Sequence, residues 1–128
     1  MTGDADKTGT PTLERLRALD TATLHESGVQ TTMRPEIRML SVDCRLAGPA
    51  LTVACPPGDN LMIHLAVAPA QPGTVLVAQC HDPGYGVWGE VLTVAAMARR
   101  IAGLVLDGSV RVPSGASVFP CLPAALLA

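Results

Sequence analysis

Aromatic side chains are scarce in this sequence of 128 residues, which contains one Tyr, one Trp and one Phe. Proteins that bind single-stranded nucleic acids stack the bases on several aromatic rings, so we expect no nucleic-acid partner. Charged residues are also few, at 16%, and the net charge of −2 offers no basic surface to a phosphate backbone. Because hydrophobic residues make up 48% of the chain, the composition favours a folded domain that binds a small metabolite.

Long uninterrupted apolar runs are missing as well. The two longest uncharged stretches, Asn60–His81 and Val112–Ala128, both contain prolines, so neither is expected to span a membrane. Residues 1–11 are polar and carry acidic side chains, unlike a signal peptide. We therefore expect a cytoplasmic protein with a polar leader over residues 1–11 and a single domain over residues 12–128.

Several sequence motifs of known chemistry are absent. G-x-x-x-x-G-K-[ST] does not occur, which leaves a nucleoside triphosphate site without support. Gly84, Gly86 and Gly89 have the spacing G-x-G-x-x-G, but they do not directly follow the predicted strand Thr74–Gln79 as a dinucleotide site requires, so we expect no such site. The four cysteines form no C-x-x-C pair: Cys44, Cys55, Cys80 and Cys121. Cys80-His81-Asp82 could suggest a nucleophile or a metal site, but adjacent residues of a strand point to opposite faces. We expect Cys80 to be a buried free thiol.

The sequence does contain alternating strand and helix patterns. Short Val- and Leu-rich runs predict strands, and helical periodicity predicts the segments between them. The predicted strands are Ala50–Cys55, Thr74–Gln79 and Leu104–Leu106, with helices at about Asn60–Ala68 and Val87–Ile101. Two short helices over Leu13–Leu19 and Thr21–Ser27, and an edge strand within Ile37–Leu40, are expected before them. This order favours an α/β layered structure.

The two longer predicted helices differ in their apolar patterns. Asn60–Ala68 is apolar almost all round, which predicts burial between layers and a buried His64, with Asp59 as N-cap. Val87–Ile101 has apolar residues at helical spacing, which predict one buried stripe. The stripe comprises Val87, Val91, Val94, Ala95, Ala98 and Ile101.

Two predicted loops place polar groups where α/β proteins bind ligands. Gly89-Glu90 opens a helix, and Asp107-Gly108 turns the chain after a strand, just before Arg111. An anionic ligand could accept hydrogen bonds from the helix-start amides and from the guanidinium. The spacing is equally compatible with Arg111 as a solvated turn residue and Glu90 as an ordinary first-turn acid.

The segments GPALTVACPPGDNLMIHLAVAPAQPGTVLVAQ and VWGEVLTVAAMARRIAGLVLDGSVR resemble one family. It contains the 4-hydroxy-4-methyl-2-oxoglutarate aldolases and the regulators of ribonuclease E activity (RraA-like proteins), and the likeness runs from about Leu19 to Arg111. The resemblance implies a layered sandwich of the swivelling β/β/α type, a homotrimer, and a 2-oxo acid (pyruvate) site with a divalent cation, Mg²⁺ or Mn²⁺.

The resemblance also implies roles for individual residues. Glu90 and Arg111 take the positions of the family's catalytic acid and arginine, and the backbone of Gly89, Glu90, Val91 and Leu92 would hold the pyruvyl group. The implied activity is retro-aldol cleavage of 4-hydroxy-4-methyl-2-oxoglutarate, with oxaloacetate decarboxylation as a side activity. A non-catalytic regulator that binds a ribonuclease is the alternative.

Two departures from the family put the activity in doubt. Val112 stands where relatives have the metal-ligating aspartate, and valine cannot bind a cation. Glu90 and Asp107 are the candidate substitutes. Residues 113–128 also diverge from the family's ending, so we expect a C-terminally shortened fold. The tail belongs either to a divergent paralogue or to a shifted reading frame, and in the second case its backbone groups would be poorly hydrogen-bonded.

Overall fold

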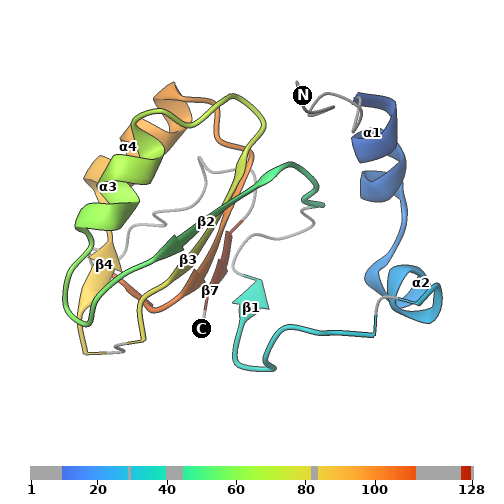
Figure 1. The fold of residues 1–128 in the computed structure, drawn as a ribbon, viewed down its shortest axis with the longest axis horizontal. Coiled ribbons are helices and arrows are strands. Elements are labelled where there is room, and N and C mark those ends of the chain that lie inside the picture. The colour runs from blue at the N-terminus through green and yellow to red at the C-terminus, as the bar shows by residue number, and fades with distance from the viewer. Residues whose placement is uncertain (1–9, 29, 40–44, 82–83, 112–124, 128) are drawn as a thin grey trace, which may run out of the picture. The chain divides into compact units, whose positions relative to one another are not determined.

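The computed structural model describes residues 10–28, 30–39, 45–81, 84–111 and 125–127 (Figure 1). The chain divides into two units, Met1–Met33 and Arg34–Ala128. The first unit contains α1 (Thr10–Ala18) and α2 (Thr21–Glu26). Their bounds are close to those of the two short helices predicted. No helix of the described residues is long and apolar enough to cross a membrane.

The second unit is built on a five-stranded sheet with the strand order β1-β7-β5-β3-β2. Its strands are β1 (Arg38–Met39), β2 (Ala50–Ala54), β3 (Val75–Gln79), β5 (Gly103–Asp107) and β7 (Ala125–Leu127). All neighbours pair in parallel except β1, which is antiparallel to β7 and forms the edge. The predicted strands within Ala50–Cys55, Thr74–Gln79, Leu104–Leu106 and Ile37–Leu40 are therefore confirmed, and the fold is α/β.

Two helices, α3 (Leu61–Val67) and α4 (Glu90–Ala98), lie side by side on one side of this sheet (Figure 1). Parallel strands need such crossover helices, because the chain must return to the same end of the sheet before it can start the next strand in the same direction. The core between the helices and the sheet is aliphatic. It includes Ile63, Val67, Leu76, Leu92, Ala96, Leu104 and Leu106.

A second, two-stranded parallel sheet pairs β4 (Gly86–Trp88) with β6 (Ser109–Val110). The predicted start of a helix at Val87 is thus wrong, since Val87 and Trp88 lie in β4 and α4 begins at Glu90. The indole Nε1 of Trp88, buried at 1% exposure, donates a hydrogen bond to Thr93 Oγ1 at 2.9 Å. This bond joins the strand to the first turn of the helix.

The prediction of which residues of α4 are buried is also wrong. Val91 and Val94 are 76% and 59% exposed, while Leu92, Thr93 and Ala96 face the core. The hydrogen bond from Trp88 to Thr93 holds Thr93 on the buried face of the helix. Val91 and Val94 are each next in sequence to a buried residue and therefore point outward. Ala98 is exposed, Ala95 is half-buried, and Ile101 is buried beyond the helix end.

Helix α3 is buried on one face rather than all round, contrary to the prediction. Ile63 and Val67 are buried, whereas Leu61, Met62 and Leu65 are exposed. His64 is exposed too, so the prediction of a buried histidine is wrong. The helix covers one face of the sheet, and in this unit no described element is placed over its outer side. The N-cap of α3 is Asn60 and not the predicted Asp59, although Asp59 Oδ1 does accept a hydrogen bond from Leu61 N, the first residue of the helix, at 2.8 Å.

Most of the divergent tail, including Val112, lies outside the described residues. Residues 125–127 are described, and as β7 they pair with both β5 and β1. The expectation of poorly hydrogen-bonded backbone is therefore wrong for these three residues.

Candidate functional site

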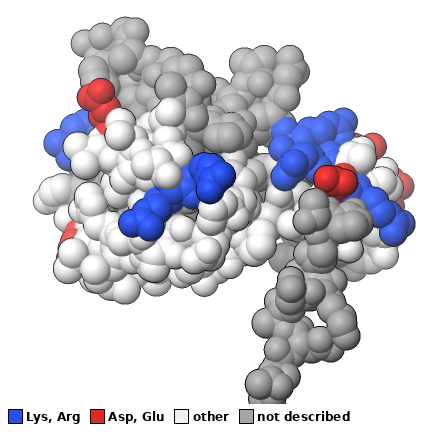
Figure 2. All heavy atoms as spheres, turned by 90° about the horizontal axis from the view of Figure 1, so that it is seen from above, with Lys and Arg blue, Asp and Glu red and all other residues white. Residues whose placement is uncertain are grey.

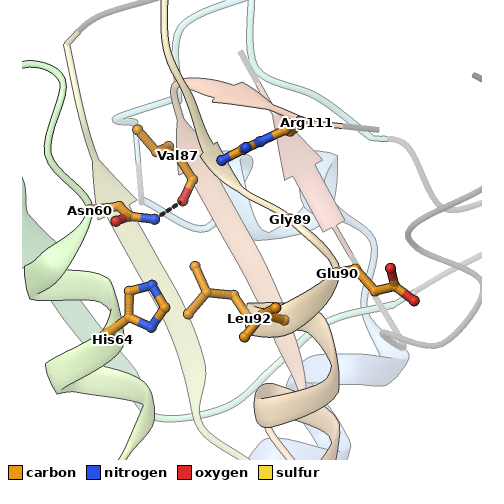
Figure 3. A pocket seen from close by; sticks show the side chains of 8 residues that line it. Asn60, His64, Val87, Gly89, Glu90, Leu92 and Arg111 are labelled. Carbon is orange, nitrogen blue, oxygen red and sulfur yellow. Dashed lines mark hydrogen bonds between the residues drawn. The ribbon is translucent and has the colours of Figure 1, made fainter. Parts of the chain in front are cut away.

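A cavity of about 630 Å³ opens where α3, β4, the start of α4 and the end of β6 meet (Figure 3). It is lined by Asn60, His64, Val87, Gly89, Glu90, Val91, Leu92 and Arg111. The structure thus brings together Arg111 and residues 89–92, which the sequence places in two loops far apart. Two residues that sequence reasoning did not assign to this site, Asn60 and His64, complete the wall.

The pairing of β4 with β6 sets the position of Arg111. Its backbone N donates a hydrogen bond to Trp88 O at 2.8 Å. A Cβ built on Gly89 would lie 4.0 Å from Arg111 O, and one built on Gly86 only 3.0 Å from Arg111 Cβ. The two segments are therefore in direct contact. This contact holds Arg111 beside the first residue of the α4 turn.

The start of α4 presents backbone donors to the cavity. Gly89 is the N-cap and has no side chain that could accept a hydrogen bond from the first-turn amides. The first amides of an α-helix have no acceptor within the helix, and the helix dipole favours an anion there. Because residues 90–92 line the cavity together with the exposed Arg111, the arrangement suits a small carboxylate.

Helix α3 is tied to this site through Asn60. Its Nδ2 donates a hydrogen bond to Val87 O at 2.8 Å, across 27 residues of sequence. His64 lies one helical turn further on, on the same side of the helix. The spacing of four residues between Asn60 and His64 was the only sequence signal for this pair.

The described carboxylates do not form a metal site. Glu90 lines the cavity and is exposed, but its carboxylate is directed away from Asn60 and His64 (Figure 3). The carboxylate of Asp107 forms an ion pair with Arg34 and does not line the cavity. Among the residues that the structure describes, no three His, Cys, Asp or Glu side chains converge on a possible cation position.

Cys80 is a buried free thiol, as predicted. Burial, together with the neighbouring Cys55 and Asp107, raises the pKa of the Cys80 thiol to about 12. The thiol is therefore neutral at physiological pH, and only the thiolate is a nucleophile. His81 is exposed, with a φ of 46°, and Asp82 lies outside the described residues.

Comparison with known proteins identifies a matching family. The RraA-like family model (Aldolase/RraA) matches residues 6–114. A curated protein of Halalkalibacterium halodurans, named "Putative 4-hydroxy-4-methyl-2-oxoglutarate aldolase", is 34% identical over 82 residues. This match covers 63% of the present chain and 39% of that protein, so the chain spans about two fifths of the relative's length.

Solved structures share the fold. An uncharacterized protein of Pseudomonas syringae pv. tomato is 26% identical, with a TM-score of 0.76, over 93% of this chain and 56% of that one. RraAS2 of Streptomyces coelicolor, described as an unusual member of the RNase ES inhibitor RraA family, is 22% identical, with a TM-score of 0.73. That match covers 93% of this chain and 63% of the other.

Proposed function

This chain belongs to the RraA-like (Aldolase/RraA) family, and on that premise we propose that it binds a small 2-oxo acid beside Arg111. The reaction that we propose is the metal-dependent cleavage of 4-hydroxy-4-methyl-2-oxoglutarate to pyruvate, with oxaloacetate decarboxylation as a side activity, at a weak or undetectable rate. One observation supports the proposal above all others. Arg111 lines the same cavity as residues 90–92, which form the first turn of α4.

The chain's own residues would bind and orient the ligand. The guanidinium of Arg111 can donate two parallel hydrogen bonds to a carboxylate, which fixes both its position and its plane. The first-turn amides of α4 can donate to the 2-oxo oxygen. When a carbon–carbon bond of the ligand breaks, negative charge develops on that oxygen, and fixed donors stabilise it.

This chain departs from the family at the residue expected to bind the divalent cation. Such a cation would withdraw electrons from the 2-oxo group. The residue that follows Arg111 is Val112. Glu90 lines the cavity, but Asp107 is paired with Arg34 and does not join it there. Loss of even a supporting group typically costs about 10- to 100-fold in metal affinity or activity. We therefore propose binding with little turnover.

The direct test is the release of pyruvate from oxaloacetate in the presence of magnesium. Val112→Asp should raise the magnesium-dependent rate at least about 10-fold, because it restores a carboxylate beside Arg111. Val112→Asn, which has the same size but no charge, should raise it much less. Full activity of the unmodified chain that a chelator leaves unchanged would contradict the metal argument. Ligand binding without turnover in Val112→Asp would favour the non-catalytic alternative.

We further propose that the chain acts in the cytoplasm as a homotrimer, without nucleic-acid or membrane partners. Support for assembly comes from the large apolar side chains that α3 and α4 expose: Leu61, Met62, Leu65, Val91, Val94 and Met97. Large apolar side chains exposed together on two neighbouring helices are typical of a protein interface. On the face shown in Figure 2, uncharged residues predominate and the charged side chains form small separate groups.

A further inference from the structure

Beyond the 2-oxo acid site, whose existence this inference assumes, His64 lies on the opposite wall of the same cavity. We propose that His64 contacts the end of the ligand remote from Arg111 and makes the site selective for a dicarboxylate over a monocarboxylate. No residue of α3 has a role in the binding described above, so this is a second recognition point with its own chemistry.

The position of His64 is fixed by three contacts of α3. Ile63 and Val67, 0% and 3% exposed, anchor the helix on the sheet. The bond from Asn60 Nδ2 to Val87 O holds the start of the helix against β4. His64 N in turn donates to Asn60 O at 3.3 Å, so the next turn follows directly. The imidazole is therefore presented to the cavity by a well-anchored helix.

Polar and apolar side chains are arranged in order along the cavity, from Arg111 to His64. Figure 3 shows Arg111 and His64 on opposite sides of Asn60, with Leu92 next to His64. Val87 and Leu92, both buried at 3% exposure, supply the apolar part of the lining. Hydrogen-bond donors at both ends, with Asn60 and the apolar Val87 and Leu92 between them, match a short carbon chain that has a carboxylate at each end.

The imidazole is available for such a contact. Within the described residues it makes no hydrogen bond to another side chain or to the backbone, and it is exposed. Neutral or charged, it has at least one N–H donor for a carboxylate. A second hollow of about 350 Å³ adjoins on this side and is lined by His64, Leu92 and Arg99, which adds positive charge there. The Glu90 carboxylate is directed away and does not oppose an anion (Figure 3).

A third hollow, of about 440 Å³, adjoins the cavity on the side of Tyr85 and shares Asn60, Val87 and Arg111 with it. Tyr85 is 60% exposed and packs over Gly58, where it offers a hydroxyl group but no cation. Apart from the shared Arg111, no cationic side chain lines this hollow among the described residues. A second carboxylate is therefore better accommodated at His64.

The experiment compares 2-oxoglutarate with 2-oxopentanoate, which has the same chain length but ends in a methyl group. Calorimetric titration should show that the unmodified chain binds 2-oxoglutarate about tenfold more tightly, the range of one hydrogen bond to a charged group. His64→Ala should remove this preference and leave the affinity for 2-oxopentanoate unchanged. His25→Ala, which changes an exposed histidine of α2, is the matched control and should keep it, as should Tyr85→Phe.

The outcomes separate this inference from the proposed function. Equal affinities of the unmodified chain for the two ligands would overturn the role of His64 and leave 2-oxo acid binding intact. Loss of the preference in Tyr85→Phe but not in His64→Ala would also overturn it, in favour of the other hollow. An equal loss of both ligands in His64→Ala, with an unchanged circular dichroism spectrum, would show that the residue does not discriminate. Binding of neither ligand by the unmodified chain would overturn both proposals.

Discussion

At the scale of single residues, Arg111 and Val112 separate two properties that an aldolase combines. Arg111 has the guanidinium group that can bind a carboxylate through two hydrogen bonds, and its backbone N donates a hydrogen bond to Trp88 O. Val112 removes the carboxylate that a cation would need in the next position. The chain is therefore expected to bind its ligand without completing the reaction efficiently.

Cys80 gives a second residue-scale prediction, which concerns pH. In the folded protein the pKa of its thiol is raised from the ordinary value of 9.0 to about 12, mainly by burial. The unfolded chain therefore loses this proton first as the pH rises, and the free energy of unfolding falls between 9.0 and about 12. Below that window the contribution is fully present.

The measurement is urea unfolding at about pH 8 and about pH 10.5, on either side of the unfolded thiol's titration. The unmodified chain should lose more unfolding free energy between the two conditions than Cys80→Ala. The comparison with this variant cancels the titration of groups that do not interact with Cys80. An identical loss in both proteins would show that Cys80 is not shielded as described.

At the scale of elements, the strands β2, β3 and β5 were predictable because each is a short Val- and Leu-rich run bounded by turn residues. The start of α4 was not predictable in this way. Val87 and Trp88 continue the helical spacing in sequence, but they pair with β6 more than twenty positions later. Local periodicity does not contain that long-range contact, and it also displaced the predicted buried face towards Val91.

The same limit applies to α3 and to half of the site. The apolar character of Leu61, Met62 and Leu65 predicts burial, yet these residues face outward. Composition does not distinguish a helix covered on both sides from one that has an exposed apolar face. Residues 89–92 and Arg111 could be paired from loop positions alone. Asn60 and His64 could not, because the bond from Asn60 to Val87 exists only in the folded chain.

At the scale of the whole molecule, the exposed faces of α3 and α4 bear on assembly. Light scattering coupled to size exclusion should give a molar mass three times the 13.2 kDa of one chain. The physical reason is that assembly removes these apolar side chains from water. A mass of 13.2 kDa that does not rise with protein concentration would contradict the proposed trimer.

The central claim is that Arg111 and the α4 amides form one carboxylate site, and calorimetric titration with oxalate tests it most directly. The unmodified chain should bind oxalate, and Arg111→Ala should bind none detectably, since it removes the bidentate charged contact. Arg15→Ala, which changes an exposed arginine of α1, should bind as the unmodified chain does. Equal oxalate affinity in Arg111→Ala and in the unmodified chain, with both proteins folded, would contradict the account.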